Sequence, residues 1–557
     1  MGILIYSLPG STISNGYNEA GREVSATYSS RIEGEEPVVI SKQYHVDGRL
    51  KLVYDAESSI THTYNSLNDL VTEQSDSGTS YSSLVNYEYD PIGNVTNLGL
   101  SILGSDSISS SYGYDQAERL IRITTSDVGN FEYIYNPTNG HISSVSNTFS
   151  GINMSYGYDL LDRLTNITYT ASGGVKIRSL EYAYNVAGMI TNKTVIGGLS
   201  PMSFSYQYDS IDRLVSESSG SSTANYNYDL ANNRTSVVED GTTNMYTLGI
   251  GNRLESWGTL GSSLYDAAGN TTNLVFNNGN LLDLKWDERY RLINIGGTST
   301  PITYGYDVLN RKISRTEGLS SSVEYYVYDD EHVIADIDDL GNLMRSYTYG
   351  NERDDILSMT TYNALSTNTY FYLKDQQNTV IALADELGNV VESYEYNAYG
   401  EVTVFNASGA ELSASEIGNR YTFQGREIDW DTKLTYFRSR WYSSEIGRWL
   451  SKDHIGIAGG LNLFAFVENN PVNYIDPSGY GKSYNRKGGA GGSGGKHKKS
   501  GKYGKQKGSG RGGTRGNRGG GRGRGRGFGG LIFTYPEIAI PMMKKALKEK
   551  KKGPQMA

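Results

Sequence analysis

The stretch SYGYDQAERLIRI at residues 111–123 decides the fold, because its pattern returns along most of the chain. Aromatic and polar residues alternate up to Tyr114, as in a half-buried β-strand. Asp115 favours a turn in which its side chain accepts backbone hydrogen bonds, and the Arg-Leu pair at 119–120 begins a return strand. One such unit therefore predicts one β-hairpin.

Similar units read YDLLDRL from residue 158, YDSIDRL from 208 and WDERYRL from 286. We call the aromatic residue before the turn the station; stations are 18 to 27 residues apart, and Asp or Asn directly follows fourteen of the eighteen. The stations are Tyr17, Tyr44, Tyr64, Tyr89, Tyr114, Tyr135, Tyr158, Tyr184, Tyr208, Tyr228, Tyr246, Tyr265, Trp286, Tyr306, Tyr328, Tyr349, Tyr372 and Tyr396. A lone hairpin is marginal in water, so successive hairpins are expected to pair edge to edge. We predict an all-β fold with a curling sheet that can form a shell.

The repeated tyrosines allow two interpretations. They can form a stacking surface for sugars, or they can form packing ladders between neighbouring hairpins. A residue that returns at every turn is explained by what every turn needs, so we favour the ladders.

The composition agrees with an all-β fold: the chain holds 46 Tyr, 12 Phe, 67 Gly and 11 Pro. It has no cysteine, which excludes disulfides, thiolate metal sites and cysteine nucleophiles. The six histidines show no metal-ligand spacing, so we expect no metal and no cofactor. The opening apolar run of about five residues is shorter than the roughly 7–15 of a secretory signal, and no run approaches the roughly 18 of a membrane span. We therefore expect neither.

Residues 370–480 carry a second pattern, which includes YFYLKDQQNTVIALADELGNVVESYEYNAYGEV from 370 and ends in VENNPVNYIDPSGY. Together with the hairpin units, this segment resembles the RHS family of YD-repeat proteins and its repeat-associated core domain. That family includes polymorphic bacterial toxins, the C component of Tc toxins and, more distantly, teneurins. The resemblance implies a repeat array over 1–369, a core domain over 370–480, a hollow shell with an inward plug, and a variable C-terminal segment that is cut off and held inside.

Two motifs carry the chemistry that the resemblance implies. The family's self-cleaving core has DPxG and DPxGL about 18 residues apart; here they are DHIGI from Asp453 and DPSGY from Asp476. A pair of close carboxylates shares one proton, so one can activate water while the other polarises a carbonyl. The resemblance implies a single-turnover aspartic autoprotease that cuts between Tyr480 and Gly481.

This chain departs from the family pattern at two of these positions, with His454 in the place of Pro and Tyr480 in the place of Leu. Arg448 is a candidate to balance the charge of the pair, or else it pairs with a surface acid. The alternative interpretation of Asp453 and Asp476 is that they only support turns, as many Asp residues of this chain do.

The composition changes abruptly at Gly481. Residues 481–557 carry a net charge of +19, which leaves −29 for the first 480. Residues 481–530 are rich in Gly, Arg and Lys and are expected to be disordered, while 531–557 form a short apolar and basic segment. Arg spaced by Gly suits nucleic acid or another anionic surface; the alternative is a basic linker that lies against the acidic region.

Two functions remain open from the sequence. In the first, a bacterial shell encloses or presents a C-terminal effector segment and releases it by self-cleavage after Tyr480. It would leave the cell by a route other than Sec and work with a companion shell subunit or a secretion apparatus. In the second, a non-enzymatic surface or interaction protein uses its basic tail as an anchor to polyanions.

Overall fold

The computed structural model describes residues 2–484, apart from 9–10, 30–35, 68, 78–80, 199–200, 221, 319–322 and 364–365. Of the basic stretch expected to be disordered over 481–530, residues 481–484 are described and include the short strand Ser483–Tyr484, so the disorder expected from Gly481 is wrong for these residues. Residues 485–530 and the segment expected over 531–557 lie outside the described residues. The described chain is dominated by one antiparallel sheet of 38 strands, β1 to β38. Each strand pairs with the next one along the chain, so the sheet is a continuous meander.

The strands are grouped here in chain order. The first group is β1 (Gly2–Leu8), β2 (Ser11–Tyr17), β3 (Glu23–Tyr28), β4 (Val38–Tyr44), β5 (Leu50–Tyr54), β6 (Ser59–Tyr64), β7 (Leu70–Asp76), β8 (Ser82–Tyr89), β9 (Val95–Ile102), β10 (Ser105–Tyr114), β11 (Leu120–Thr125), β12 (Gly129–Tyr135) and β13 (Ile142–Asn147). The second is β14 (Asn153–Tyr158), β15 (Leu164–Thr170), β16 (Lys176–Tyr184), β17 (Ile190–Ile196), β18 (Met202–Tyr208), β19 (Leu214–Ser219), β20 (Ser222–Tyr228), β21 (Arg234–Glu239), β22 (Thr242–Leu248), β23 (Leu254–Trp257), β24 (Gly261–Tyr265), β25 (Thr271–Phe276) and β26 (Leu281–Trp286). The third is β27 (Leu292–Gly296), β28 (Ile302–Tyr306), β29 (Lys312–Glu317), β30 (Val323–Asp329), β31 (His332–Ile337), β32 (Leu343–Tyr349), β33 (Ile356–Asn363), β34 (Ser366–Lys374), β35 (Val380–Ala384), β36 (Val390–Tyr396), β37 (Val402–Asn406) and β38 (Glu411–Leu412).

After the large sheet come a four-stranded sheet, a two-stranded pair and short 3-10 helices. The sheet holds β39 (Glu427–Ile428), β40 (Leu434–Phe437), β41 (Arg440–Ser443) and β42 (Arg448–Trp449), and the pair is β43 (Tyr474–Ile475) with β44 (Ser483–Tyr484). The helical turns of the whole described chain are η1 (Ser172–Gly174), η2 (Ile250–Asn252), η3 (Phe423–Gly425), η4 (Gly456–Ala458) and η5 (Phe466–Asn469). Within the described part, no helix is long and apolar enough to cross a membrane.

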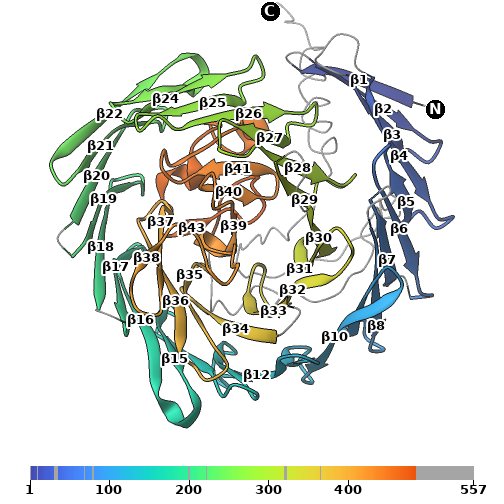
Figure 1. Ribbon diagram of the computed structural model, residues 1–557, viewed down its shortest axis with the longest axis horizontal. Helices are drawn as coiled ribbons and strands as arrows, with labels where there is room; N and C mark the ends of the chain where they lie inside the picture. Colours follow the sequence, from blue (N-terminus) through green and yellow to red (C-terminus); the bar gives the residue numbers. More distant parts are fainter. Residues whose placement is uncertain are drawn as a thin grey trace, which may run out of the picture.

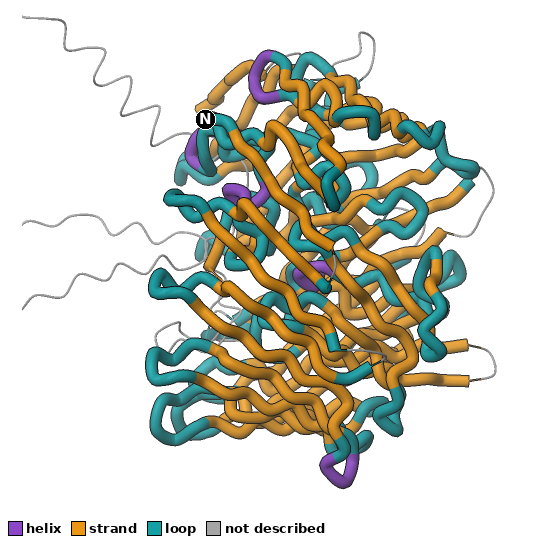
Figure 2. The backbone as a smooth tube through the Cα atoms, turned by 90° about the vertical axis from the view of Figure 1, so that its left-hand side faces the viewer, coloured by secondary structure: helices purple, strands orange, loops and turns teal. Residues whose placement is uncertain are grey.

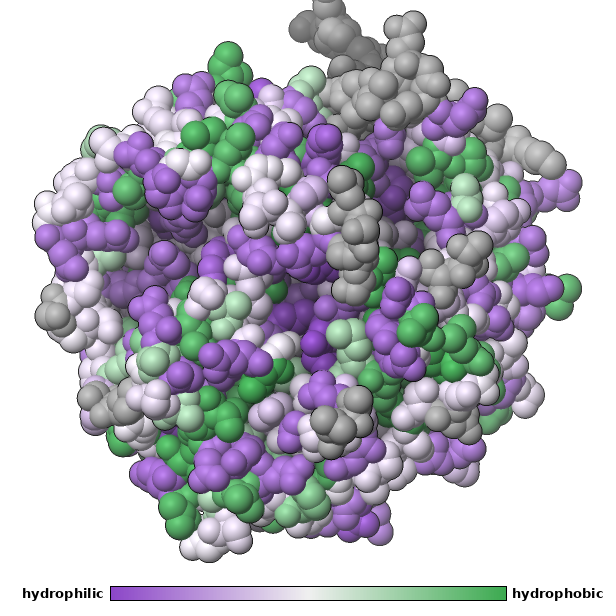
Figure 3. Space-filling model, viewed as in Figure 1, coloured by the Kyte–Doolittle hydropathy of each residue, from purple (hydrophilic) through white to green (hydrophobic). Residues whose placement is uncertain are grey.

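The large sheet spirals inward (Figure 1). Its first strands form an outer wall, its later strands pass inside that wall, and β39 to β42 lie near the centre. Successive strands run obliquely and side by side from one rim of the wall to the other (Figure 2). Hydrophilic and hydrophobic side chains are mixed over the face shown in Figure 3, and hydrophilic ones surround the hollow near its middle. The all-β curling sheet predicted from the sequence is confirmed.

The station turns follow the predicted design. In the unit at Tyr114, Tyr114 pairs with Leu120 across the turn, and the Asp115 carboxylate accepts the backbone N–H groups of Ala117 and Arg119, both at 2.9 Å. Glu118 takes the left-handed conformation with φ of 60°. Most related units place Gly, Asn or Asp at that position, which tolerate it better, whereas the unit at Trp286 has Tyr290 there with φ of 62°.

A ladder of hydroxyl groups links neighbouring hairpins. The station side chain donates to the carbonyl of the first residue of the preceding return strand: Tyr114 to Val95 at 2.8 Å, Tyr158 to Ile142 at 3.0 Å, Tyr208 to Ile190 at 2.6 Å, Tyr306 to Leu292 at 2.8 Å, and the Trp286 indole to Thr271 at 2.6 Å. The Arg of the Arg-Leu pair lies over the next station ring, as Arg163 does over Tyr184 at 4.7 Å. These contacts need a ring with a donor at its tip, which accounts for the excess of Tyr over Phe.

Two stations lie two residues beyond the tyrosine that the sequence indicated. In β22 the residue that pairs across the turn is Leu248, with Leu254, and in β34 it is Lys374, with Val380. The assignments of Tyr246 and Tyr372 were therefore wrong in register. Residues two apart share a face of a strand, so the alternation pattern alone could not separate them.

The inner strands are tied to the outer wall by hydrogen bonds between distant parts of the chain. The Tyr169 hydroxyl donates to the Lys374 carbonyl at 2.8 Å and accepts from its N–H at 2.7 Å. The Val308 N–H donates to the Ser58 hydroxyl at 2.9 Å. The sheet continues through residue 370 as far as Leu412, and the expected boundary between 369 and 370 lies inside β34.

The innermost part is an aromatic cluster formed by β40 to β42 and η5. It holds Phe437, Tyr442, Trp449 and Phe466, each at most 2% exposed. Burial of aromatic side chains on this scale provides the apolar centre on which the loops after β42 are fixed. We call β39 to β44 and their loops the plug.

Candidate active site at the plug

The DPSGY motif forms a closed loop between β43 and β44. Asp476 is only 1% exposed. Its carboxylate accepts the backbone N–H of Tyr480 at 3.1 Å and that of Gly481 at 2.9 Å. The carboxylate therefore lies directly against the peptide bond that joins Tyr480 to Gly481. Asp side chains often accept backbone N–H groups in turns, and here the turn that Asp476 closes contains this peptide bond.

Asp453 reaches the same place from the loop after β42. Its backbone N–H donates to the Leu463 carbonyl at 2.9 Å, and its carboxylate accepts the N–H of Ile455 at 3.0 Å. The residue is 8% exposed. Burial in the folded chain thus keeps both carboxylates largely out of water.

Arg440 joins the two carboxylates. Its Nη2 atom lies 3.2 Å from Asp453 Oδ2 and 3.0 Å from Asp476 Oδ2, and its Nε donates to the Gly479 carbonyl. The guanidinium carbon lies 4.0 Å from the centre of the Trp449 ring, which holds it in place. One buried guanidinium therefore contacts both carboxylates and also the loop that contains Asp476.

The surroundings favour a proton on the pair. Burial raises the pKa of Asp453 to about 6, Arg440 opposes this rise, and the nearby Asp476 carboxylate adds to it. Burial also raises the pKa of Asp476, again against the effect of Arg440. Two acids on one guanidinium can share a single proton near neutral pH.

Three consecutive residues of the β40–β41 turn hold three consecutive carbonyls of the loop. Arg438 donates to the Pro477 carbonyl, Ser439 donates from its hydroxyl to that of Ser478 at 2.9 Å, and Arg440 donates to that of Gly479. Gly479 has φ of 72°, and a Cβ atom there would lie 2.4 Å from the Phe437 carbonyl oxygen. Only glycine allows this approach. The residues before the Tyr480–Gly481 bond are therefore fixed in position.

Arg448 lies elsewhere. Its guanidinium donates to Asn233 Oδ1 at 3.4 Å and to the Asn252 carbonyl, and so it ties the plug to the outer wall. The arginine that contacts both carboxylates is Arg440, which the sequence did not single out. The chain has an Arg-Trp pair at both places, Arg440-Trp441 and Arg448-Trp449, and nothing in the local sequence tells the two apart.

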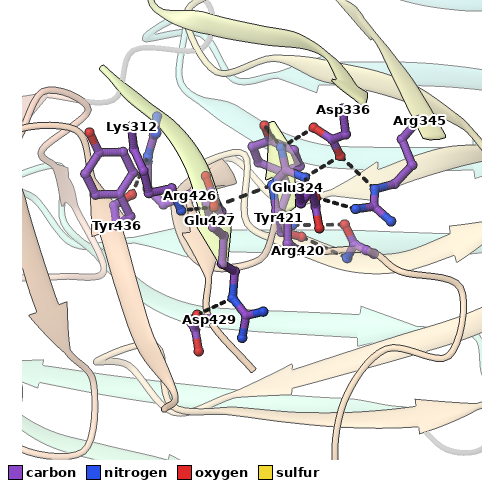
Figure 4. Close-up of polar contacts among 12 residues, drawn as sticks. Lys312, Glu324, Asp336, Arg345, Arg420, Tyr421, Arg426, Glu427, Asp429 and Tyr436 are labelled. Carbon is purple, nitrogen blue, oxygen red and sulfur yellow. Dashed lines mark hydrogen bonds and ion pairs between the residues drawn. The ribbon is translucent and has the colours of Figure 1, made fainter. Parts of the chain in front are cut away.

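A buried network of charges connects the plug to the inner strands (Figure 4). Arg420 Nη2 lies 2.6 Å from Asp336 Oδ1, and Lys312 contacts Glu427. The network reaches the loop through Asp354, whose carboxylate lies 2.7 Å from Arg426 Nη1 and 2.6 Å from Arg438 Nη2. Buried ion pairs of this kind fix the relative position of the elements that they join, because removal of one partner leaves the other charge buried and unpaired.

A family model described as Teneurin YD-shell matches residues 126–472, more than half of the chain. The tRNA nuclease WapA of Bacillus subtilis strain 168 is 28% identical over 287 residues, which are 49% of this chain and 12% of WapA. The double-stranded DNA deaminase toxin A of Burkholderia cenocepacia is 24% identical over 334 residues, which are 54% of this chain and 22% of that toxin. This chain thus spans less than a quarter of each of these relatives.

The structure of the Tc holotoxin pore of Photorhabdus luminescens, with a mutated TccC3, is similar in fold. The TM-score is 0.70 at 17% sequence identity, and the match covers 86% of this chain and 26% of that chain. Nearly the whole described fold therefore has a counterpart in a solved structure.

Proposed function

The chain belongs to the Teneurin YD-shell family, and from this premise we propose that it is a shell that carries its own C-terminal segment and cuts it off between Tyr480 and Gly481. The observation that carries the proposal is the contact of both Asp453 and Asp476 with Arg440 beside this bond. Relatives that share the shell have names of bacterial toxins and nucleases, which supports an effector role for the segment after the cut.

The proposed reaction is hydrolysis of one peptide bond. The ionised carboxylate of the pair takes a proton from water, the hydroxide adds to the Tyr480 carbonyl carbon, and the protonated carboxylate stabilises the oxyanion. The bond to the Gly481 nitrogen then breaks, and that nitrogen takes a proton. Asp476 Oδ2 accepts the N–H of this nitrogen at 2.9 Å and so lies beside it, and the pair can return the proton that it took from water once the nitrogen becomes tetrahedral.

A weakly activated pair of carboxyl groups suffices for such a reaction. The bond belongs to the same chain and is held by the three carbonyl contacts of the β40–β41 turn, so no encounter with a separate substrate is needed. Arg440 stabilises the one negative charge that the pair keeps, and it orients the loop through Gly479. One turnover per molecule completes the function.

Intact mass after expression of the full chain tests the proposal. We expect fragments of residues 1–480 and 481–557, and a single full-length mass for Asp453→Asn and for Asp476→Asn. Asp385→Asn is the matched control, because Asp385 accepts two backbone N–H groups in an ordinary turn, at 2.9 and 2.8 Å, and it should leave cleavage unchanged. A single full-length mass for the unmodified, folded chain would refute self-cleavage.

A second candidate function uses the same shell without a cut. Its basis is the division of charge between the first 480 residues, at −29, and the rest, at +19. In this case the tail is an anchor to nucleic acid or another polyanion. Binding of residues 481–557 to RNA that weakens steeply with salt, together with an uncut chain, would favour it.

We further propose that the shell acts outside the bacterium that makes it and meets a companion subunit there. The support is the fold match to a Tc holotoxin and the 40% identity, over 85 residues, to toxin subunit YenC1 of Yersinia entomophaga. Those residues are 15% of this chain and 8% of YenC1.

A further inference from the structure

A small cavity lies between the plug and the outer wall, beside the bond proposed to be cut. Its volume is about 40 Å³, and its lining includes Tyr480 and His454 from the plug and Tyr28, Arg289 and Tyr290 from the wall. One water needs roughly 10–15 Å³ on this scale, so the cavity has room for a few water molecules. Tyr480 forms one of its sides.

The two residues that depart from the family pattern face each other here. The rings of His454 and Tyr480 have centroids 6.1 Å apart at 59°, and on its other side His454 lies 5.9 Å from Tyr290 at 50°. Tilted aromatic pairs at such distances are favourable. A proline at 454 or a leucine at 480 would remove the contact.

Arg289 supplies buried donors at the cavity. Its side chain is 4% exposed; Nη2 donates to the Val308 carbonyl at 2.7 Å, and Nη1 lies 3.6 Å from Asp55 Oδ2, beyond hydrogen-bond distance. Within the described residues, Nε and Nη1 have no hydrogen-bond partner. Buried guanidinium N–H groups call for an acceptor. Arg289 and Tyr480 line the same cavity; burial raises the pKa of the Tyr480 phenol, and the charges of Arg440 and, to a smaller extent, Arg289 oppose the rise.

We propose that this cavity is the subsite for the side chain at the cleavage position and that it selects tyrosine. His454 forms the wall against which the ring lies, and Arg289 binds the phenolic oxygen through water in the cavity. The proposal rests on the proposed function and deepens it, because it names what the cleavage site recognises. Phenylalanine would keep the ring contact but leave the Arg289 donors without the oxygen, and leucine would lose both.

The rate of self-cleavage tests the subsite. The full chain is made by cell-free synthesis with a short radioactive pulse, and the appearance of the 1–480 fragment is followed with time. We expect Tyr480→Phe to slow cleavage roughly ten-fold and Tyr480→Leu to slow it more. In an Arg289→Met chain, which keeps the length of the side chain without its donors, the further change Tyr480→Phe should alter the rate less than two-fold. Tyr54→Phe, at an exposed tyrosine, is the matched control.

A second measurement does not depend on cleavage. In full chains that carry Asp476→Asn, the thermal midpoint is measured for Tyr480→Phe, for Arg289→Met and for both together. The double change should lower the midpoint by less than the sum of the two single changes, because each single change removes the same interaction between Arg289 and the phenol.

Equal cleavage rates for the unmodified chain and for Tyr480→Phe would overturn the subsite while the self-cleavage stands. If the unmodified chain is not cut at all, the proposed function fails, and additive midpoint changes would then overturn the contact between Arg289 and the phenol as well. Non-additive midpoints in an uncut chain would support the contact alone.

Discussion

Ionised Asp453 should weaken the fold that holds it, and the size of the effect follows from its pKa. Burial raises that pKa from 3.8 to about 6. A tenfold change in proton affinity corresponds to about 1.4 kcal/mol, so ionisation costs the folded chain about 3 kcal/mol. The folded state binds this proton more tightly than the unfolded state, so the contribution is complete below pH 3.8 and is lost as the pH rises through 6.

The test compares Asp476→Asn with Asp476→Asn plus Asp453→Asn, since neither chain can cut itself. Among the causes of the raised pKa of Asp453, the effect of Asp476 is the smallest, so the rise persists without it. The two thermal midpoints should agree near pH 4. Above pH 6.5 the chain with both changes should melt about 3 °C higher, given about 1 kcal/mol per degree for roughly 480 folded residues.

Asp354→Asn provides a control of opposite sign. Arg426 and Arg438 hold the pKa of Asp354 well below its usual range, so its ionised form stabilises the fold and its loss should lower the midpoint at neutral pH. A midpoint difference for Asp453 that does not change between pH 4 and pH 7, or that grows toward acid, would refute the reasoning.

Two further predictions concern the cleavage loop and the ladder. Arg440→Lys keeps one positive charge but cannot make the three contacts of a guanidinium, so self-cleavage should fall about 100-fold while the chain stays folded by circular dichroism; an unchanged rate would show that charge alone suffices. Tyr114→Phe removes a 2.8 Å hydrogen bond to the Val95 carbonyl worth about 1 kcal/mol, so amide hydrogen exchange around residues 95–99 should quicken about five-fold, whereas exposed Tyr54→Phe should change nothing. Equal exchange in both variants would contradict the ladder.

The repeating part of the fold could be predicted from the sequence because its signals are local. The alternation before Tyr114, the Asp at 115 and the Leu at 120 lie within ten residues, and each specifies a backbone shape by itself. The register failed by two residues at Tyr246 and Tyr372, where another residue type takes the place before the turn, and at Tyr328 the strand runs one residue further, to Asp329. What the local sequence does not contain is the inward course of the spiral, which depends on contacts such as that between Tyr169 and Lys374, 205 residues apart.

The candidate site shows the same limit. Asp453 and Asp476 were singled out because their motifs resemble a family pattern, and the structure places both against one guanidinium. Arg440 and Arg289 were missed, because the first has a twin sequence at Arg448 and the second belongs to a hairpin more than 150 residues before the cleavage loop. Their importance arises only when the wall and the plug are packed together.

The two rims of the wall differ in how much change in chain length they can absorb. On the rim of the station turns, the Asp159 N–H donates to the Arg163 carbonyl at 2.9 Å, and the same five-residue closure returns at most stations; closures one residue longer occur at Asn136 and Gly350. On the opposite rim the connections vary, from the tight turn at 103–104 between β9 and β10 to the exposed helical turn η1 at 172–174. Most of the unequal spacing of the repeats is therefore taken up away from the station turns. The exposed turn η1 has the same closure, from the Ala171 N–H to the Val175 carbonyl at 2.8 Å, so a fluorescent label attached there by substitution, not by insertion, would leave the neighbouring hairpins in register and give a handle for following the shell.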